Sequence, residues 1–407
     1  MKSPGKRITI MLASGLSLAL AACGSSGGSS SGAAGGASSG SPLVVGAVVS
    51  ESGGLDALGA PELAAMQAAV TYYNAHGGAG GHQIKLVVQN DQSTPALSAT
   101  AVRKLVQQNG AQVIIGPDDQ GLAAAAIPVA IASKVPMLES AGNWPIAGLS
   151  DADMHSTVYP VVPDTNTAAI DAMVNQILKP RGFTKVGVLL DNSAYSLAIE
   201  GPLQAAAPKD GFSVVSTQVM AAGATDATPQ VLKLLAAHPD LILVGSPPGP
   251  DSVTSVEAIR AQDPNVPIYV DQASATTAFA QAVGASNLDN VLILAAAPND
   301  IDALSASSPY RPKVQEFLTA MKEQSQYPTP ATQGTAFIGW MGVEELVDAV
   351  GAAKSTSPPA IEQALSHAND YTVAVNWART ASAPGGYSGY ALFMLQYENG
   401  QFVKASS

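Results

Sequence analysis

The sequence predicts an α/β fold with two lobes, each built on a doubly wound parallel sheet. From residue 43 onward, short apolar runs alternate with segments of helical periodicity, which is the pattern of a parallel sheet covered by helices on both faces. The pattern restarts after a proline-flanked stretch at 159–163. Residues 43–407 are also too many for one compact core and enough for two.

The first set of elements begins with a strand and a helix. Strands are expected at 43–49, 84–88, 111–115 and 135–138. Helices are expected from Pro61 to about residue 76, at 95–108 and at 122–133. Pro61 suits the first turn of a helix, and apolar residues then recur at three- and four-residue spacing at Leu63, Met66, Val70 and Tyr73.

The second set repeats this order after the proline-flanked stretch. Its helices are expected at 165–178, 196–206, 229–237 and 252–261. Its strands are expected at 185–190, 213–219, 241–244, 268–270 and 291–295. Three later helices (about 310–324, 332–352 and 358–367) and two apolar runs (388–396 and 401–403) start no obvious third domain. The economical interpretation is that the chain returns to the earlier lobes.

The first 22 residues are typical of a signal peptide for export. Lys2, Lys6 and Arg7 precede an apolar stretch at 8–20, which is too short for a stable membrane span. Small residues then precede Cys23, the single cysteine of the chain. This arrangement resembles the lipobox of bacterial lipoproteins, in which the cysteine is acylated; the alternative is an ordinary cleaved signal with an incidental cysteine.

Residues 23–42 are expected to form the lipidated Cys23 and a flexible tether. The tether is almost entirely Gly, Ser and Ala and has too little apolar surface to fold. Lipid chains give membrane affinity without a transmembrane helix. We expect an exported protein anchored on the outer face of the cell membrane, or on the periplasmic side of an envelope membrane.

The composition argues against several classes of function. Lys and Arg number 19 against 31 Asp and Glu, a formal net charge of −12, which disfavours nucleic acid as a partner. The match to G-x-S-x-G at 36–40 lacks the preceding strand and following helix of a hydrolase. The histidines lie far apart, at His76, His82, His155, His238 and His367. No catalytic site, metal site or cofactor is predicted.

Several motifs in the chain occur together in one known family. They are Val45-Gly46-Ala47 with Ser52-Gly53, Asn74-Ala75-His76-Gly77-Gly78, Asp91-Gln92-Ser93-Thr94-Pro95, Ile114-Ile115-Gly116-Pro117 and Gly223-Ala224-Thr225-Asp226. In this order they resemble type 1 periplasmic binding proteins, the branched-chain amino acid, amide and urea binders of ABC importers. The resemblance implies two lobes joined by a three-strand hinge, with the ligand in the cleft between them. It implies that 43–160 and 298–370 form lobe 1, and that 161–297 and 371–407 form lobe 2. It implies a monomer that captures a small molecule and passes it to permease subunits.

In lobe 1, the resemblance and the rule that ligands lie beyond the carboxyl ends of parallel strands indicate two loops. The first contains Asp119 and Gln120, where an aspartate either faces the ligand or caps the following helix; which of Asp118 and Asp119 faces the cleft stays open. The second loop offers Ser140, Ala141 and Gly142. Trp144 follows it, and we favour packing at the lobe edge over stacking on a ligand.

In lobe 2, the resemblance implies ligand contacts from Tyr195, Ser246, Asp271 and Gln272. Leu58 stands where some relatives carry an aromatic residue, so a plain leucine-type ligand is not expected. The acidic loops favour a neutral amide-like, urea-like or cationic compound, with amino acids the usual ligands of the family. The alternatives to a transport protein are a ligand-sensing protein for a signalling partner and, less favoured, an enzyme on the same fold.

Overall fold

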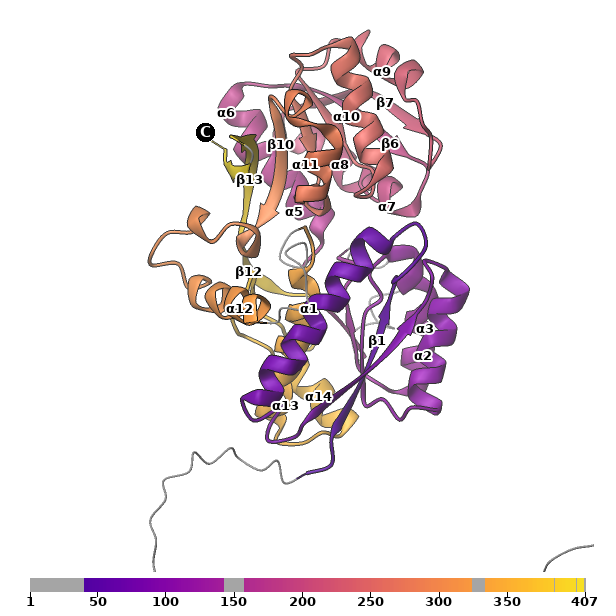
Figure 1. Ribbon diagram of the computed structural model, residues 1–407, viewed down its shortest axis with the longest axis vertical. Coiled ribbons are helices and arrows are strands. Elements are labelled where there is room, and N and C mark those ends of the chain that lie inside the picture. The colour runs from indigo at the N-terminus through magenta and orange to yellow at the C-terminus, as the bar shows by residue number, and fades with distance from the viewer. Residues whose placement is uncertain (1–39, 143–156, 324–333, 384, 400, 406–407) are drawn as a thin grey trace, which may run out of the picture. The chain divides into compact units, whose positions relative to one another are not determined.

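Two β-sheets organise the part of the chain that the computed structural model describes, residues 40–142, 157–323, 334–383, 385–399 and 401–405 (Figure 1). Helices cover both faces of each sheet, and the chain passes between the sheets three times. These crossings follow strands β5, β10 and β12. The predicted α/β fold of two lobes joined by three connections is therefore confirmed.

The sheet of lobe 1 has five parallel strands in the order β2-β1-β3-β4-β5. These strands are β1 (Leu43–Val49), β2 (Ile84–Asn90), β3 (Val113–Ile115), β4 (Met137–Glu139) and β5 (Val158–Pro160). One face packs against α1 (Asp56–Ala75) and α13 (Phe337–Ala353), and the other against α2 (Pro95–Gln107) and α3 (Gln120–Ser133) (Figure 1). Burial on both faces explains why β1 is a nearly continuous apolar run.

The sheet of lobe 2 has seven strands in the order β14-β13-β10-β9-β8-β6-β7. Five of them are parallel: β6 (Lys185–Asp191), β7 (Ser213–Met220), β8 (Leu241–Val244), β9 (Ile268–Val270) and β10 (Val291–Ala296). The C-terminal strands β13 (Leu392–Glu398) and β14 (Gln401–Lys404) pair antiparallel beside β10. The sheet is thus mixed at one edge, a detail that the alternation of strands and helices did not predict.

The helices of lobe 2 pack on opposite faces of this sheet. One face carries α5 (Thr165–Met173), the π-helical turn η1 (Val174–Leu178), α6 (Lys179–Arg181) and α8 (Glu200–Asp210). The other carries α9 (Thr228–Leu235), α10 (Pro250–Gln262) and α11 (Thr277–Val283). The single helix predicted at 196–206 is two pieces, α7 (Ala194–Leu197) and α8. The sequence prediction missed β5, which overlaps the proline-flanked stretch, and the seven-residue helix α11.

The later helices return to lobe 1. They are α12 (Arg311–Glu323), α13 and α14 (Pro358–Leu365), and the short strands β11 (Val375–Trp377) and β12 (Tyr387–Tyr390) come after them. Residues 373–375 and Trp377 are part of the same apolar core as β1 and α13. The boundary predicted at residue 371 is therefore misplaced, because the chain rejoins the second sheet only at β13.

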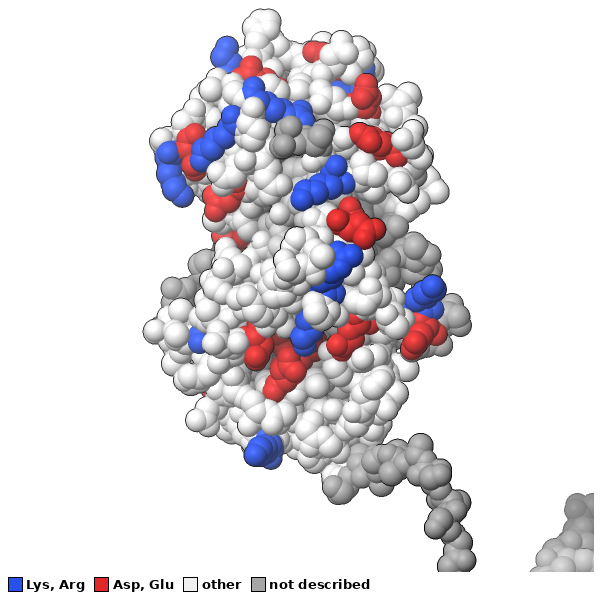
Figure 2. All heavy atoms as spheres, turned by 90° about the vertical axis from the view of Figure 1, so that its left-hand side faces the viewer, with Lys and Arg blue, Asp and Glu red and all other residues white. Residues whose placement is uncertain are grey.

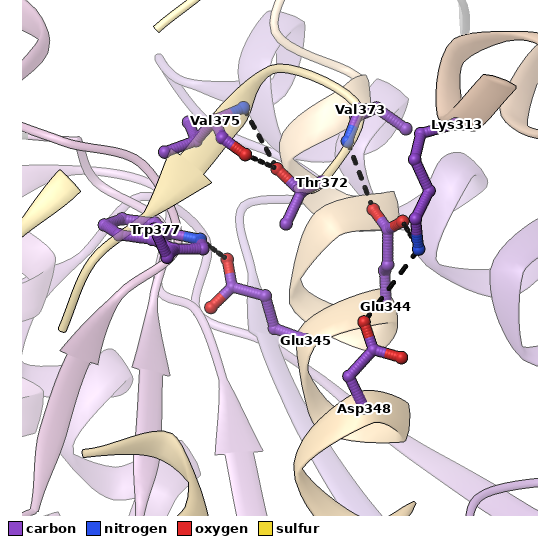
Figure 3. Close-up of polar contacts among 8 residues, drawn as sticks. All are labelled: Lys313, Glu344, Glu345, Asp348, Thr372, Val373, Val375 and Trp377. Carbon is purple, nitrogen blue, oxygen red and sulfur yellow. Dashed lines mark hydrogen bonds and ion pairs between the residues drawn. The ribbon is translucent and has the colours of Figure 1, made fainter. Parts of the chain in front are cut away.

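Ion pairs and a hydrogen bond hold α12 and the segment around Trp377 against α13 (Figure 3). Lys313 of α12 lies 2.9 Å from a carboxylate oxygen of Glu344. The Trp377 indole N–H donates to Glu345 over 2.9 Å, and Arg379 forms an ion pair of 2.8 Å with the same carboxylate. Charges taken out of water need such partners, so the polar side chains of α13 hold the C-terminal segment on lobe 1.

The signal peptide and tether predictions, including lipidation of Cys23, concern residues that lie almost wholly outside the described part of the chain. Contacts divide the chain into 1–36 and 37–407, and both lobes belong to the second unit. Within the described ranges, no helix has the length and apolar character required to span a membrane.

Candidate functional site

A cavity of about 60 Å³ is lined by residues from both lobes. Lobe 1 contributes loops that follow β3 and β4, together with the first turns of α1 and α13. Lobe 2 contributes the start of α5, Tyr195 and the loop after β9. Most of these segments lie at the carboxyl ends of parallel strands, where open α/β sheets bind their ligands.

Ser50 joins the loops that follow the first three strands of lobe 1. Its amide donates to Asp118 Oδ2 over 3.0 Å. Its hydroxyl lies 2.9 Å from Asp118 Oδ1 and 3.0 Å from Asp91 Oδ1. Since one hydroxyl hydrogen serves one acceptor at a time, the two carboxyl groups share this donor. Asp118 lines the cavity and is only 4% exposed.

Asp119 has a different environment from its neighbour. Its side chain accepts hydrogen bonds from the amides of Gly121 and Leu122, at 2.8 and 3.3 Å. It is therefore the N-cap of α3, and it does not line the inner cavity. Of the two aspartates, Asp118 faces the inner cavity, whereas the prediction placed Asp119 among the ligand contacts.

Glu62 enters the cavity from α1, and two close backbone approaches fix its position. A Cβ atom on Gly59 would lie 2.3 Å from Asp118 Oδ2, and one on Gly339 would lie 2.0 Å from the carbonyl oxygen of Glu62. Glycine at these two positions lets α1 approach both the loop after β3 and α13. Glu62 is 2% exposed as a result.

The loop after β4 lines the cavity through Ser140, Ala141 and Gly142. The Ser140 hydroxyl donates to the carbonyl of Pro117 over 3.0 Å. The amide of Ala141 donates to Glu139, and the carbonyl of Gly142 accepts from the amide of Thr165, the first residue of α5, over 2.6 Å. Two of the predicted donors, the Ser140 hydroxyl and the Ala141 amide, are thus bonded within the protein, and the Gly142 carbonyl connects this loop to lobe 2.

Lobe 2 presents a hydrogen-bonded acid to the cavity. The Tyr195 hydroxyl donates to Asp271 Oδ2 over 2.7 Å, and the amide of Ala273 donates to Oδ1 over 3.1 Å. Tyr390 donates to the side-chain oxygen of Gln272 over 3.3 Å, which leaves the Gln272 amide nitrogen without a partner among the described residues. Tyr195, Asp271 and Gln272 all line the cavity, and their contact with a ligand stays a prediction.

An outer recess of about 420 Å³ adjoins the same loops. Gly54, Leu55, Ser93 and Asp119 of lobe 1 line it, and so do Tyr195 and the prolines after β8. Tyr195 lines both spaces and therefore separates the inner cavity from the recess.

Comparison with known proteins identifies the architecture. A family model described as "Periplasmic binding protein" matches residues 42–400. The chain belongs to this family. A Leu/Ile/Val-binding protein homolog 7 of Brucella abortus (strain 2308) is 24% identical over 336 residues, which is 79% of this chain and 80% of that protein. The relatives are solute-binding proteins, which at the family level agrees with the absence of a predicted enzymatic role and implies an extracytoplasmic location.

Two solved structures have the same fold as this chain. Rp1789 of Rhodopseudomonas palustris (strain CGA009) superimposes with a TM-score of 0.79 at 23% identity, covering 90% of this chain and 100% of that chain. The branched-chain amino acid binding protein LivJ from Streptococcus pneumoniae, solved in complex with isoleucine, gives a TM-score of 0.67 at 22% identity and covers 89% and 100%. At these identities the likeness concerns the fold.

The residues that the resemblance indicated fall into two groups in this binding protein. Ser140, Ala141, Gly142, Tyr195, Asp271 and Gln272 meet around the inner cavity. Asp119, Gln120 and Ser246 do not line it, and the Ser246 hydroxyl is buried without a partner among the described residues. Trp144 lies outside the described residues. The prediction missed Glu62, Thr165 and Asn166 because each lies in the first turns of a helix, where polar residues usually face solvent.

The cavity of this binding protein is acidic, whereas the face shown in Figure 2 carries both signs of charge. On the face in Figure 2, Lys and Arg lie beside Asp and Glu on a mostly uncharged surface. Among the described residues that line the cavity, three are acidic (Glu62, Asp118 and Asp271) and none is basic. Burial raises the pKa of Asp118 to about 7 and that of Asp271 to about 6. Burial, with the nearby Asp118 carboxyl, raises the pKa of Glu62 well above its usual value.

Proposed function

We propose that this chain is the extracytoplasmic solute-binding component of an ABC importer, which captures a small polar molecule between its lobes. The observation that carries the proposal is the inner cavity, because both lobes contribute polar groups to one small space. A ligand that touches both lobes favours the arrangement in which they meet, and this gives a hinge mechanism. Permease subunits would then recognise the closed form.

The relatives support a small amino acid or related compound as the ligand class. One is described as a Leu/Ile/Val-binding protein homolog, and the similar LivJ structure holds isoleucine. Leu58, Ala169, Leu294 and Ile338 give the cavity of this chain an apolar side, while the acids and the Gln272 amide give it a polar one. A few polar groups on an otherwise apolar wall are typical of small-molecule sites.

A thermal-unfolding screen of metabolites tests the proposal. A ligand at 100 times its dissociation constant should add about 2.7 kcal/mol to the free energy of unfolding. Asp271→Ala should weaken the binding of any hit by about tenfold or more, because an acid that holds the ligand is lost. A protein that no small polar metabolite stabilises would contradict the proposal.

We further propose that Cys23 is acylated and that residues 23–42 tether the binding protein to a membrane. The residues before Cys23 carry this proposal, because they match the lipobox pattern. Expression in a bacterial host with a radiolabelled fatty acid should label the wild type and leave Cys23→Ala unlabelled. Release of the variant from the membrane fraction would support the anchor, whereas equal labelling of both proteins would refute it.

A further inference from the structure

The three acids that line the inner cavity differ in what they bind. Both oxygens of Asp118 lie within hydrogen-bond distance of Ser50. Both oxygens of Asp271 accept hydrogen bonds, from Tyr195 and from the amide of Ala273. Glu62, by contrast, has an oxygen, Oε2, that is buried and has no hydrogen-bond partner in the described part of the chain.

The neighbours of Glu62 make this carboxylate harder to bury. The Asp118 and Glu139 carboxyl groups both raise the pKa of Glu62, and the nearby Ser140 hydroxyl lowers it. In this structure the hydrogen of that hydroxyl is donated to the carbonyl of Pro117. Glu139 is itself fully buried, and one of its oxygens has no partner among the described residues. An unpaired buried carboxylate is costly unless a cation or a donor from elsewhere completes it.

We propose that a positively charged nitrogen group of the ligand, a guanidinium, amidinium or primary ammonium, binds to Glu62 beside Asp118 and that Glu62 determines this specificity. The inference rests on the proposed solute-binding function and names the chemical class of the ligand. Groups of this kind carry two or more N–H donors and a charge, so they satisfy an unpartnered oxygen and neutralise the cluster together.

A metal ion fits the acids less well than an organic cation. Among the described residues, no group of three or more His, Cys, Asp and Glu side chains is arranged to hold a metal. Oxygen-binding metals need several ligands that converge on one point. The apolar side of the cavity, formed by Leu58, Ile338 and Leu294, in addition suits the carbon part of an organic molecule.

Pairs of ligands with the same shape and different charge test the inference by titration calorimetry. Methylguanidine is compared with methylurea, and arginine with citrulline, on the wild type and on Glu62→Gln. The wild type should prefer the cation of at least one pair by about 30-fold, and Glu62→Gln should reduce the ratio of that pair to near one, because a buried charge partner is lost. Glu62→Asp keeps the charge and should retain part of the preference.

Glu51→Gln serves as the matched control, because it removes the same charge from an exposed position just after β1; its preference should equal that of the wild type. The inference is overturned if the neutral member of each pair binds as well as the cation, if no member binds, or if Glu62→Gln keeps the wild-type ratio. The thermal-unfolding screen of metabolites tests the proposed solute-binding function independently of this inference. A neutral hit there would keep that function while this inference fails, and an empty screen would overturn both.

Discussion

Two groups of buried acids in lobe 1 differ in their partners. On α13, Glu344 lies 2.9 Å from Lys313 of α12, and Glu345 pairs with Arg379 at 2.8 Å. Around the cavity, Glu62 and Glu139 are equally buried, and each has an oxygen without a partner in the described part of the chain. Burial of a carboxylate therefore does not by itself indicate a ligand site. The described residues around the cavity supply no counter-charge to its acids, and this separates them from the acids that hold the fold together.

Arg379→Met should lower the free energy of unfolding most, because it leaves the buried Glu345 carboxylate without its counter-charge. The guanidinium of Arg379 is fully buried, pairs with Glu345, donates to the carbonyl of Pro160, and lies 3.8 Å from the Trp377 ring centroid. Removing one member of a buried pair costs about 3–5 kcal/mol. Urea unfolding should show this loss.

A second substitution sharpens this test. When Arg379→Met is combined with Glu345→Gln, no charge is left uncompensated, and the new amide oxygen can still accept from the Trp377 indole. Much of the lost stability should return, since paired removal of buried charges is often nearly neutral. If the double variant is as unstable as the single one, the packing of the Arg379 stem, rather than its charge, supports the C-terminal segment.

Glu139→Gln should raise, not lower, the free energy of unfolding of the ligand-free protein. Burial raises the pKa of Glu139 to about 8, above its unfolded value of about 4.3. The protonated form is therefore favoured in the fold, and wild-type stability falls as the pH rises between these values. The variant lacks this loss, and near pH 8 it should be about 2 kcal/mol more stable than the wild type.

The difference between the variant and the wild type should be small at pH 4 and grow up to about pH 8. Thermal or urea unfolding at several pH values measures it, and Glu51→Gln at an exposed position gives the baseline. A difference that is independent of pH would mean that Glu139 ionises normally in the fold. Glu139 would then not count as a buried acid without a partner.

Tyr195→Phe tests the acid of lobe 2, which is hydrogen bonded rather than ion paired. The lost hydroxyl donates to Asp271 over 2.7 Å, and removal of a hydrogen bond to a charged group costs about 1.5–3 kcal/mol. The pKa of Asp271 should rise further, because this hydrogen bond lowers it. Calorimetry with any confirmed ligand should show weaker binding, with Tyr397→Phe as the control. Unchanged affinity would indicate that Tyr195 only separates the two spaces.

The sequence predicted the fold more completely than the site. Strands such as 241–244 and 268–270 are found within a residue of their expected bounds, because strands buried on both faces are apolar runs that end at turns. The mixed edge of the second sheet and the position of 373–377 depend on long-range packing. Local periodicity carries no information about which core a late segment joins.

The site predictions depended on the family resemblance and on the rule that ligands lie at strand ends. This rule finds only residues located just after a strand. Ser140, Tyr195 and Asp271 occupy such positions and line the cavity. Glu62 lies within α1, and its burial results from the close approach of α13 at Gly339. In the sequence, Glu62 looks like a solvated residue beside Leu63, so no local pattern could have identified it.

Asp119→Ala should change stability least among these substitutions. It also checks the division between partnered and unpartnered acids. This acid adjoins Asp118, yet its carboxylate is satisfied by the amides of Gly121 and Leu122. Loss of an N-cap costs about 1 kcal/mol, and Asp119→Asn, which still caps, should restore most of it. Urea unfolding measures both variants. If ligand affinity falls while stability does not, Asp119 contacts the ligand rather than stabilising the fold. Hydrogen-bond partners would then fail to distinguish the acids that bind ligand from the acids that stabilise the protein.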